Sequence, residues 1–244
     1  MKHQTAAILV IGNEVLSGRT RDANAWLAAQ RLFAQGCRLE EIAVVPDRMA
    51  AIIDTLNRLR GRYEAVITSG GIGPTHDDIT ADAIAAAFEV AIGPDPRAMA
   101  ILGEHYAERG LEFTDARKRM ARMPRGANHI ENPVSIAPGF NVENVYVMAG
   151  VPSVFQAMLG NVLPTLKTGA KLISKTVHCP HPEGAIGGPL GEIQKAHPLT
   201  VIGSYPKFRD GKFWTELVIR ARSTEALDPA VAAVEAMIAE LASR

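Results

Sequence analysis

The sequence predicts an α/β fold, in which helices cover both faces of a mostly parallel sheet, followed by a small α+β region. Three observations support this prediction. Short apolar runs alternate with helical patterns over the first part of the chain, a glycine-rich loop separates the third run from the next helix, and shorter strand and helix patterns follow after residue 169.

Strands and helices alternate from the start of the chain. The compact apolar run at residues 6–11 ends at Gly12 and predicts a buried strand. Asp47 is expected to cap a later helix that stops at Gly61. The other expected elements are strands at 42–45 and 65–68 and helices at 22–35 and 80–88. Ligands of such sheets bind at the carboxyl ends of the strands, so the loops after the first and third strands are the first places to look for a site.

The second half of the chain predicts two further regions. Residues 94–123 are expected to be mostly helical, and a strand at 145–148 leads into a helix that opens with Gly150-Val151-Pro152. A boundary near residue 168 divides the chain into expected domains at 1–168 and 169–244. The second domain should contain strands at 172–177, 199–202 and 213–220 and helices at 188–196 and 229–241.

The charge balance excludes some partners. The chain has 26 Lys and Arg and 26 Asp and Glu residues, so neither nucleic acid nor a membrane surface is expected as a partner. The run at residues 6–11 is too short for a signal peptide, and no later run approaches the roughly 18 apolar residues of a membrane span. The two cysteines, Cys37 and Cys179, are too few for a disulfide framework, which favours a cytoplasmic protein.

The loop Ser69-Gly70-Gly71-Ile72-Gly73-Pro74-Thr75-His76-Asp77-Asp78 carries the chemistry. Its three glycines lie between a strand and a helix, where backbone N–H groups can turn toward an anion, most often phosphate. The hydroxyls of Ser69, Thr75 and Thr80 can add donors. The spacing matches neither a Walker loop nor the dinucleotide fingerprint, so the loop predicts phosphate binding without naming the ligand.

Acidic residues beside this loop predict a metal ion. Asp77, Asp78 and Asp82 follow the glycines, and two like charges about 4 Å apart cost roughly 4 kcal/mol at an effective dielectric of 20. Mg²⁺ commonly bridges one or two carboxylates and a substrate phosphate, so Asp78 or Asp77 is expected as a metal ligand. The alternative is that Asp78 and Thr80 cap the following helix, which does not exclude ligand contact.

Five motifs in order along the chain resemble one family. The segment from Ser69 to Thr80 looks like the signature of the molybdopterin-binding (MoaB/MogA-like) domain, and more narrowly of the competence/damage-inducible protein A branch. The last of the other four resembles the tail of the subgroup related to the N-terminal domain of eukaryotic FAD synthase. These four are Ile11-Gly12-Asn13-Glu14-Val15-Leu16-Ser17-Gly18, Asn132-Pro133-Val134-Ser135-Ile136-Ala137-Pro138-Gly139-Phe140, Gly150-Val151-Pro152-Ser153 and Ile202-Gly203-Ser204-Tyr205-Pro206.

The resemblance implies a three-layer α/β/α sandwich with the ligand over the glycine loop and two functional acids, Asp47 and Asp78. It also implies a divalent metal (Mg, Mn or Co) and self-association as a dimer or trimer. In the cofactor-biosynthesis relatives the domain serves Mg-dependent adenylylation of molybdopterin. In the other branches it is associated with metal-dependent hydrolysis of ADP-ribose or FAD. No segment resembles the amidohydrolase or FAD-synthesising domains of larger relatives, so neither activity is expected.

The candidate catalytic residues are therefore Asp47, Asp78 and Glu14, and the metal ligands are Asp78 and Asp77. Glu14 is interpreted as a general base or metal ligand, with a surface turn acid as the alternative. Asn132 is a candidate hydrogen-bonding partner for a base or pterin edge, or else a turn residue. The expected ligand-binding residues are Gly12, Asn13, Ser69, Gly70, Gly71, Gly73, Thr75, Asp77, Thr80, Asn132, Pro138, Gly139, Gly150 and Pro152.

Other polar and aromatic residues receive structural interpretations. His178, Cys179, His181 and Glu183 form at most a partial zinc set, so a packed or mobile loop is favoured. His76 is a phosphate contact or a solvated side chain. Trp26 and Trp214 are expected to pack. Arg117, Lys118, Arg119 and Arg122 are expected to form a solvated helix face, with phosphate binding as the alternative.

Three functions follow from these residues. The leading hypothesis is hydrolysis of a phosphoanhydride in ADP-ribose, FAD or a similar dinucleotide. The second is a molybdopterin adenylyl transferase or carrier. The third is a binding module without catalysis. In each case the partner is a small nucleotide or pterin.

Overall fold

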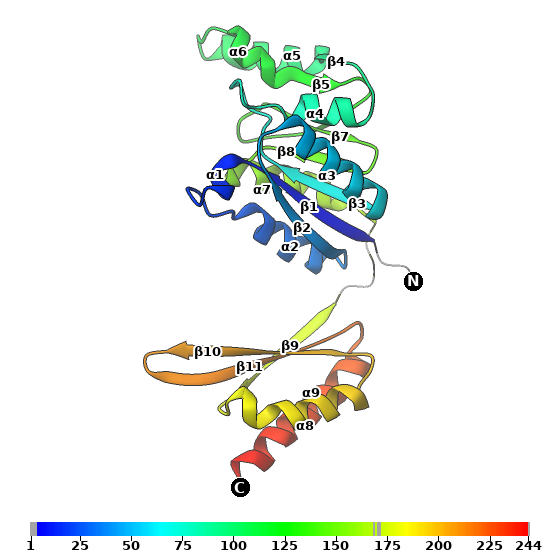
Figure 1. Cartoon of the computed structure of the whole chain (residues 1–244), viewed down its shortest axis with the longest axis vertical. Helices are drawn as coiled ribbons and strands as arrows, with labels where there is room; N and C mark the ends of the chain where they lie inside the picture. The colour runs from blue at the N-terminus through cyan, green and yellow to red at the C-terminus, as the bar shows by residue number, and fades with distance from the viewer. Residues whose placement is uncertain (1–3, 168, 170–171, 244) are drawn as a thin grey trace. The chain divides into compact units, whose positions relative to one another are not determined.

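The computed structural model describes residues 4–167, 169 and 172–243 (Figure 1). The chain forms two compact units, Met1–Gly169 and Ala170–Arg244. None of the described helices has both the length and the hydrophobicity of a membrane span.

The first unit contains the following elements in chain order: β1 (Thr5–Ile11), α1 (Asn13–Leu16), α2 (Asn24–Ala34), β2 (Arg38–Val45), α3 (Met49–Arg62), β3 (Ala65–Ser69), α4 (Thr80–Ala87), β4 (Ile92–Pro94), α5 (Pro96–Glu108), α6 (Asp115–Lys118), η1 (Arg119–Ala121), β5 (Arg122–Pro124), β6 (Asn128–Ile130), β7 (Gly139–Val142), β8 (Val145–Met148), α7 (Pro152–Val162) and η2 (Leu163–Thr165). The expected strands and long helices are present, and their ends differ by a few residues from the predictions.

A six-stranded sheet in the order β2-β1-β3-β8-β7-β6 forms the centre of this unit. The four strands β2, β1, β3 and β8 run parallel, and β7 is antiparallel to both β8 and β6. The β1 strand is buried along almost its whole length because both of its faces are covered by helices. The predicted mostly parallel α/β sheet is therefore confirmed.

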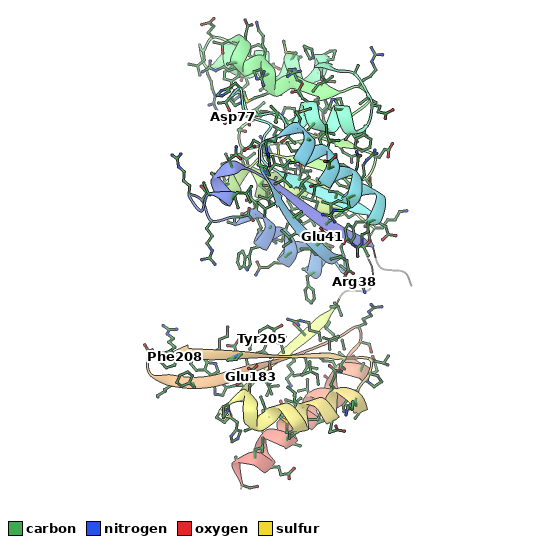
Figure 2. The ribbon with its side chains drawn as sticks, in the orientation of Figure 1. Arg38, Glu41, Asp77, Glu183, Tyr205 and Phe208 are labelled. Carbon is green, nitrogen blue, oxygen red and sulfur yellow. The ribbon has the colours of Figure 1, made fainter. Side chains whose placement is uncertain are left out.

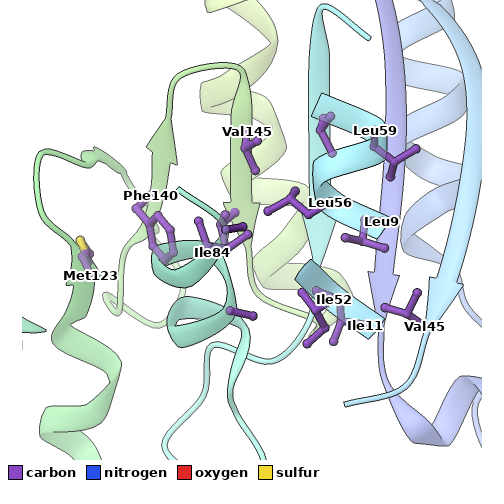
Figure 3. Close-up of a cluster of buried hydrophobic side chains, with 14 of the residues drawn as sticks. Leu9, Ile11, Val45, Ile52, Leu56, Leu59, Ile84, Met123, Phe140 and Val145 are labelled. Atoms are coloured by element: carbon purple, nitrogen blue, oxygen red, sulfur yellow. The ribbon is translucent and has the colours of Figure 1, made fainter. Parts of the chain in front are cut away.

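Alternate side chains of β1 enter two separate cores. Leu9 faces the core beneath α3 and α4, together with Leu56 and Phe140 (Figure 3). Its neighbour Ile8 faces the opposite core, which it shares with residues of α2 and α7 such as Phe155. This period of two follows from the pleat of the strand, and it confirms the three-layer arrangement.

The middle of the chain is less helical than expected. Helix α5 and the short α6 fall within residues 94–123, but β4 and β5 pair with each other at either end of this segment. Strands β6 and β7 were also not predicted. Each of these strands has only three or four residues, so the local sequence carries too few alternations to reveal them.

The second unit is a three-stranded antiparallel sheet, in the order β10-β11-β9, with two helices packed on it. Its elements are β9 (Ile173–Cys179), α8 (Glu183–Ala196), β10 (Val201–Arg209), β11 (Lys212–Ala221) and α9 (Thr224–Ala242). Helix α8 begins earlier than expected, since burial of Ile186 outweighs the low helix propensity of its glycines. The turn at Asp210-Gly211 has positive φ at both residues, which suits a two-residue hairpin.

Trp26 differs from the expectation of a packed side chain, whereas Trp214 agrees with it in part. Trp26 on α2 is 64% exposed. Trp214 on β11 is partly buried, and its ring lies 6.2 Å from that of His178. The apolar spacing of α2 places Ala25, Ala28 and Leu32 in the core, which turns Trp26 outward.

Candidate functional site

A cavity of about 730 Å³ lies at the carboxyl ends of the parallel strands. Its wall includes the residues that follow β1, β2, β3 and β8, as expected for a sheet of this class. The predicted site residues that line it are Gly12, Glu14, Asp47, Gly70, Gly71, Gly73, Thr75, Asp77, Asp78, Asn132 and Gly150. The structure therefore brings most of the candidates together around one space.

Hydrogen bonds from Thr80 fix the conformation of the glycine loop. Gly70 and Gly71 have positive φ values of 107° and 71°, which favour glycine. The Thr80 hydroxyl donates to the Gly70 carbonyl at 3.0 Å, and the Thr80 N–H donates to the Gly71 carbonyl at 2.9 Å. Thr80 is fully buried, so its side chain fixes the loop and does not line the cavity.

Ser69 is also a structural residue, and its partner Asn24 was missed by the sequence analysis. The Asn24 side-chain amide donates to Ser69 Oγ at 2.8 Å and to the Gly150 carbonyl at 2.7 Å. These bonds join α2 to the ends of β3 and β8. The sequence did contain a signal for Asn24. It lies on the same face of α2 as the buried Ala28 and Leu32, which follow one and two turns later.

Asp77 and Asp78 lie beside each other at the end of the glycine loop, and Asp77 is labelled in Figure 2. The Thr75 hydroxyl lies 2.6 Å from Asp77 Oδ1 and 2.5 Å from Asp78 Oδ2, so its single O–H can donate to either carboxylate. The hydrogen bond from Thr75 lowers the pKa of Asp77. The Thr75 N–H also donates to Asp78 Oδ2, at 2.8 Å.

These contacts decide between the two interpretations of Asp78. The cap position of α4 is Ile79, and no side chain caps the helix there. The capping alternative for Asp78 and Thr80 is therefore wrong, because Asp78 accepts from Thr75 and Thr80 donates backward to Gly70. Both carboxylates remain on the cavity wall.

Asp47 and Glu14 complete the acidic wall. The expectation that Asp47 caps α3 is wrong: Arg48 is the cap residue, and Asp47 Oδ2 accepts a hydrogen bond of 2.7 Å from the Asn13 N–H. Asn13 thus positions Asp47 through its backbone and does not itself line the cavity. Glu14 turns back over Gly12, where an added Cβ would stand 2.5 Å from Glu14 Oε1.

The donor set of this wall fits a hard divalent cation. Among the residues that the structure describes, no three His, Cys, Asp or Glu side chains are grouped to hold a metal by themselves. The available donors are carboxylate oxygens of Asp47, Asp77 and Asp78, which Mg²⁺-type ions accept together with phosphate oxygens and water. A metal in this cavity would need the ligand to complete its coordination.

The segment 178–183 shows no zinc site within the described residues. Cys179 is buried and its Sγ contacts the His181 carbonyl, while Glu183 accepts a hydrogen bond from Ser204. The expected packed or mobile loop is confined to residues 180–182, because His178 and Cys179 belong to β9 and Glu183 begins α8. His76, the other histidine considered, does not line the large cavity.

Asn132 organises a loop that forms another part of the cavity wall. Its Oδ1 accepts from the N–H groups of Val134 and Ser135 at 3.1 Å each, and its Nδ2 donates to Ser135 Oγ and to the Ala137 carbonyl at 2.6 and 2.8 Å. The amide is engaged by its own loop, so the structure favours the turn interpretation over a base contact. Ile136 in this loop has φ of 67°, which is rare for a β-branched residue.

Besides Asn13, Ser69 and Thr80, three further predicted ligand contacts lie outside the large cavity. Pro138 lines two smaller cavities beside it. Gly139 is buried at the start of β7, and Pro152 is the first residue of α7, a position where its missing N–H is harmless. The loop residues Val134, Ser135 and Ala137 were not predicted as contacts and line the cavity instead.

The expected solvated basic face is wrong for two of its four residues. Arg122 makes two hydrogen bonds to Asp82, at 2.6 and 3.0 Å, and Arg119 Nη2 donates to the Asp78 carbonyl at 3.3 Å. Arg117 lies over the Tyr106 ring, 4.4 Å from its centroid, and Lys118 pairs with Asp115. The segment folds against the glycine loop because η1 replaces the expected longer helix.

Two family models match consecutive parts of the chain. Residues 7–168 match the probable molybdopterin binding domain, and residues 171–243 match the middle domain of FAD synthase. The chain belongs to the molybdopterin binding domain family. The expected resemblance, including its FAD synthase-related tail, is thereby confirmed.

Individual relatives agree with this assignment. A protein from Aeropyrum pernix is 33% identical, and the match covers 97% of this chain and 92% of the relative. A CinA-like protein from Myxococcus xanthus is 32% identical over 93% of this chain and 57% of the relative, so the chain spans little more than half of that protein. The crystal structure of CinA from Thermoplasma acidophilum, a protein described as having unknown function, superposes with a TM-score of 0.62 at 30% identity. That match covers 67% of this chain and 98% of the solved one.

Proposed function

We propose that this chain hydrolyses a phosphoanhydride of a dinucleotide of the ADP-ribose or FAD type with the help of a divalent metal ion. The observation that carries the proposal is the meeting of Glu14, Asp47, Asp77 and Asp78 with the glycine turn around one cavity of about 730 Å³. Such a volume lies within the usual range for small-molecule sites. The matches to a molybdopterin-binding and a FAD synthase middle domain support a ligand of this class.

The charges of the wall explain why a metal is required. A phosphate at the glycine turn would face three aspartates, and each unit-charge pair about 4 Å apart costs roughly 4 kcal/mol at an effective dielectric of 20. Asp78 and Asp77 would hold the metal together with oxygens of the ligand and water, and the bound metal would offset this repulsion and polarise the phosphoryl oxygens. Asn13 and Thr75 keep the carboxylates in place through the hydrogen bonds described above.

Glu14 is assigned to the proton transfer. In hydrolysis, a water oxygen forms a bond to one phosphorus, and the bond from that phosphorus to the bridging oxygen breaks. The water loses one proton to the Glu14 carboxylate, and the bridging oxygen leaves as part of the second phosphate monoester. Glu14 suits this role because it lines the same cavity as the aspartates assigned to the metal.

The test is incubation of the purified protein with ADP-ribose or FAD and Mg²⁺, Mn²⁺ or Co²⁺. We expect AMP release that requires the metal and is lost in Asp78→Asn. Asp54→Asn, which removes an exposed carboxylate of α3, is the matched control and should keep the activity. Absence of AMP from a folded wild-type protein with all three metals would contradict the proposal.

A second candidate is a Mg-dependent molybdopterin adenylyl transferase or carrier. The family match over residues 7–168 favours it, and the apolar wall of the cavity, with Ile72, Val134 and Val151, suits a flat ring. A fluorescent pterin that copurifies with the protein, or rescue of a molybdenum-cofactor mutant, would favour this function. Ligand binding without turnover would instead indicate a binding module. Self-association remains a prediction that light scattering can check.

A further inference from the structure

Arg119 differs from its neighbour Arg122 in how its charge is compensated. The guanidinium of Arg122 is paired with Asp82 through two hydrogen bonds. Arg119 reaches a backbone carbonyl, that of Asp78, and no described carboxylate lies within ion-pair distance of it. Its Nε is buried and meets no hydrogen-bond partner in the described part of the chain.

Arg119, whose charge has no carboxylate partner among the described residues, lies close to the glycine turn. Arg119 lines a small space of about 10 Å³ together with Gly71, Gly73 and Asp78, which also line the large cavity. The next residue, Met120, borders both spaces. A space of this size accommodates one water-sized group, such as a single phosphate oxygen, but not a whole phosphate.

A partly buried guanidinium without an anionic partner is costly, because Arg stays protonated and each buried donor needs an acceptor. Asp82 is already neutralised by Arg122, and the Asp78 carboxylate is engaged by Thr75. The remaining acceptor of suitable charge and shape is an anion at the glycine turn, since a guanidinium fork matches phosphate oxygens.

We propose that Arg119 binds one phosphate oxygen of the ligand through the small space behind the glycine turn. This inference rests on the proposed function and adds a protein cation to the metal-assisted binding of the phosphate. It predicts that Arg119 distinguishes ligands that differ in the phosphate alone. A purely structural role, in which Arg119 holds the Asp78 backbone, predicts no such discrimination.

The experiment measures the affinity of AMP and of adenosine by calorimetry in the presence of Mg²⁺. In Arg119→Gln, we expect AMP to bind about tenfold more weakly or worse, while adenosine binding is unchanged. Arg119→Lys keeps the charge but loses the fork, so its AMP affinity should be intermediate. Arg125→Gln removes an exposed charge from the same segment and should bind AMP as the wild type does.

Circular dichroism verifies the fold of each variant, and Arg119→Lys replaces Arg119→Gln if the latter does not fold. Unchanged AMP affinity, or equal weakening of AMP and adenosine, would overturn the inference. If the wild-type protein still released AMP from ADP-ribose, this failure would leave the proposed function standing. If the wild type neither bound AMP nor hydrolysed ADP-ribose, both proposals would fall.

Discussion

The parallel and antiparallel halves of the central sheet contribute different groups to the same cavity. The parallel strands β1, β2 and β3 end in acidic residues or in the glycine turn. The antiparallel pair β6 and β7 is joined by residues 131–138, whose contribution is the Asn132 loop with Val134 and Ser135. Under the proposed function, the parallel half would supply the reacting and metal-binding groups, and the antiparallel half would supply the shape of the site.

The largest effect on activity is expected from substitutions of the acids in the parallel half. Asp78→Asn removes the negative charge that we assign to the metal and should lower kcat for ADP-ribose hydrolysis by about 100-fold or more. Asp47→Asn should have a similar effect, since its carboxylate shares the cavity. Initial rates at saturating metal check both variants. A loss of less than tenfold in both would break the assignment of chemistry to this half.

A substitution in the antiparallel half should change the free energy of unfolding and the affinity for the substrate. Asn132→Ala removes four hydrogen bonds and leaves backbone groups of the loop unpaired, so the free energy of unfolding should fall by about 2 kcal/mol. We expect a higher KM with a smaller change in kcat. Urea denaturation and steady-state kinetics measure these quantities. A collapse of kcat with unchanged KM would instead place Asn132 among the reacting groups.

The same contrast explains what the sequence could predict. The apolar run of β1, the glycine loop and its acids are local patterns, so the parallel half and its candidates followed from short segments. The roles of Asn24, Arg119 and Arg122 depend on partners 40 or more residues away, at Ser69, Asp78 and Asp82. Spacing gives no information on such contacts, and strands as short as β5, β6 and β7 carry little local pattern.

A smaller effect should come from the strained backbone of the Asn132 loop. Ile136→Gly and Ile136→Ala both remove the side chain, but only glycine adopts a φ of 67° without strain. The glycine variant should therefore be more stable than the alanine variant by about 1 kcal/mol. Thermal or urea unfolding of the pair measures the difference. Equal stability would show that the loop relaxes when Ile136 is truncated.

The smallest effect on activity is expected at the opposite end of the parallel strands. Burial, followed by the charge of Glu64, raises the pKa of the Cys37 thiol to about 11. The thiol therefore stays protonated at pH 8, and its stabilising contribution is lost only as the pH rises from about 9 through 11. Alkylation of Cys37 by iodoacetamide should be about 100-fold slower in the folded than in the unfolded protein. Exposure of the folded protein to iodoacetamide should therefore leave its activity unchanged. Rapid modification of the native protein would contradict this assignment.

We infer that the acids of the parallel half repel a bound phosphate unless a cation bridges them. The most direct measurement is the affinity of AMP for the wild type and for Asp78→Asn, each with and without Mg²⁺. We expect Mg²⁺ to tighten AMP binding at least about tenfold in the wild type and much less in the variant. Without the metal, Asp78→Asn should bind AMP more tightly than the wild type, because one repelling charge is gone. Equal AMP affinity of the wild type with and without Mg²⁺, or weaker metal-free binding by the variant, would contradict the claim.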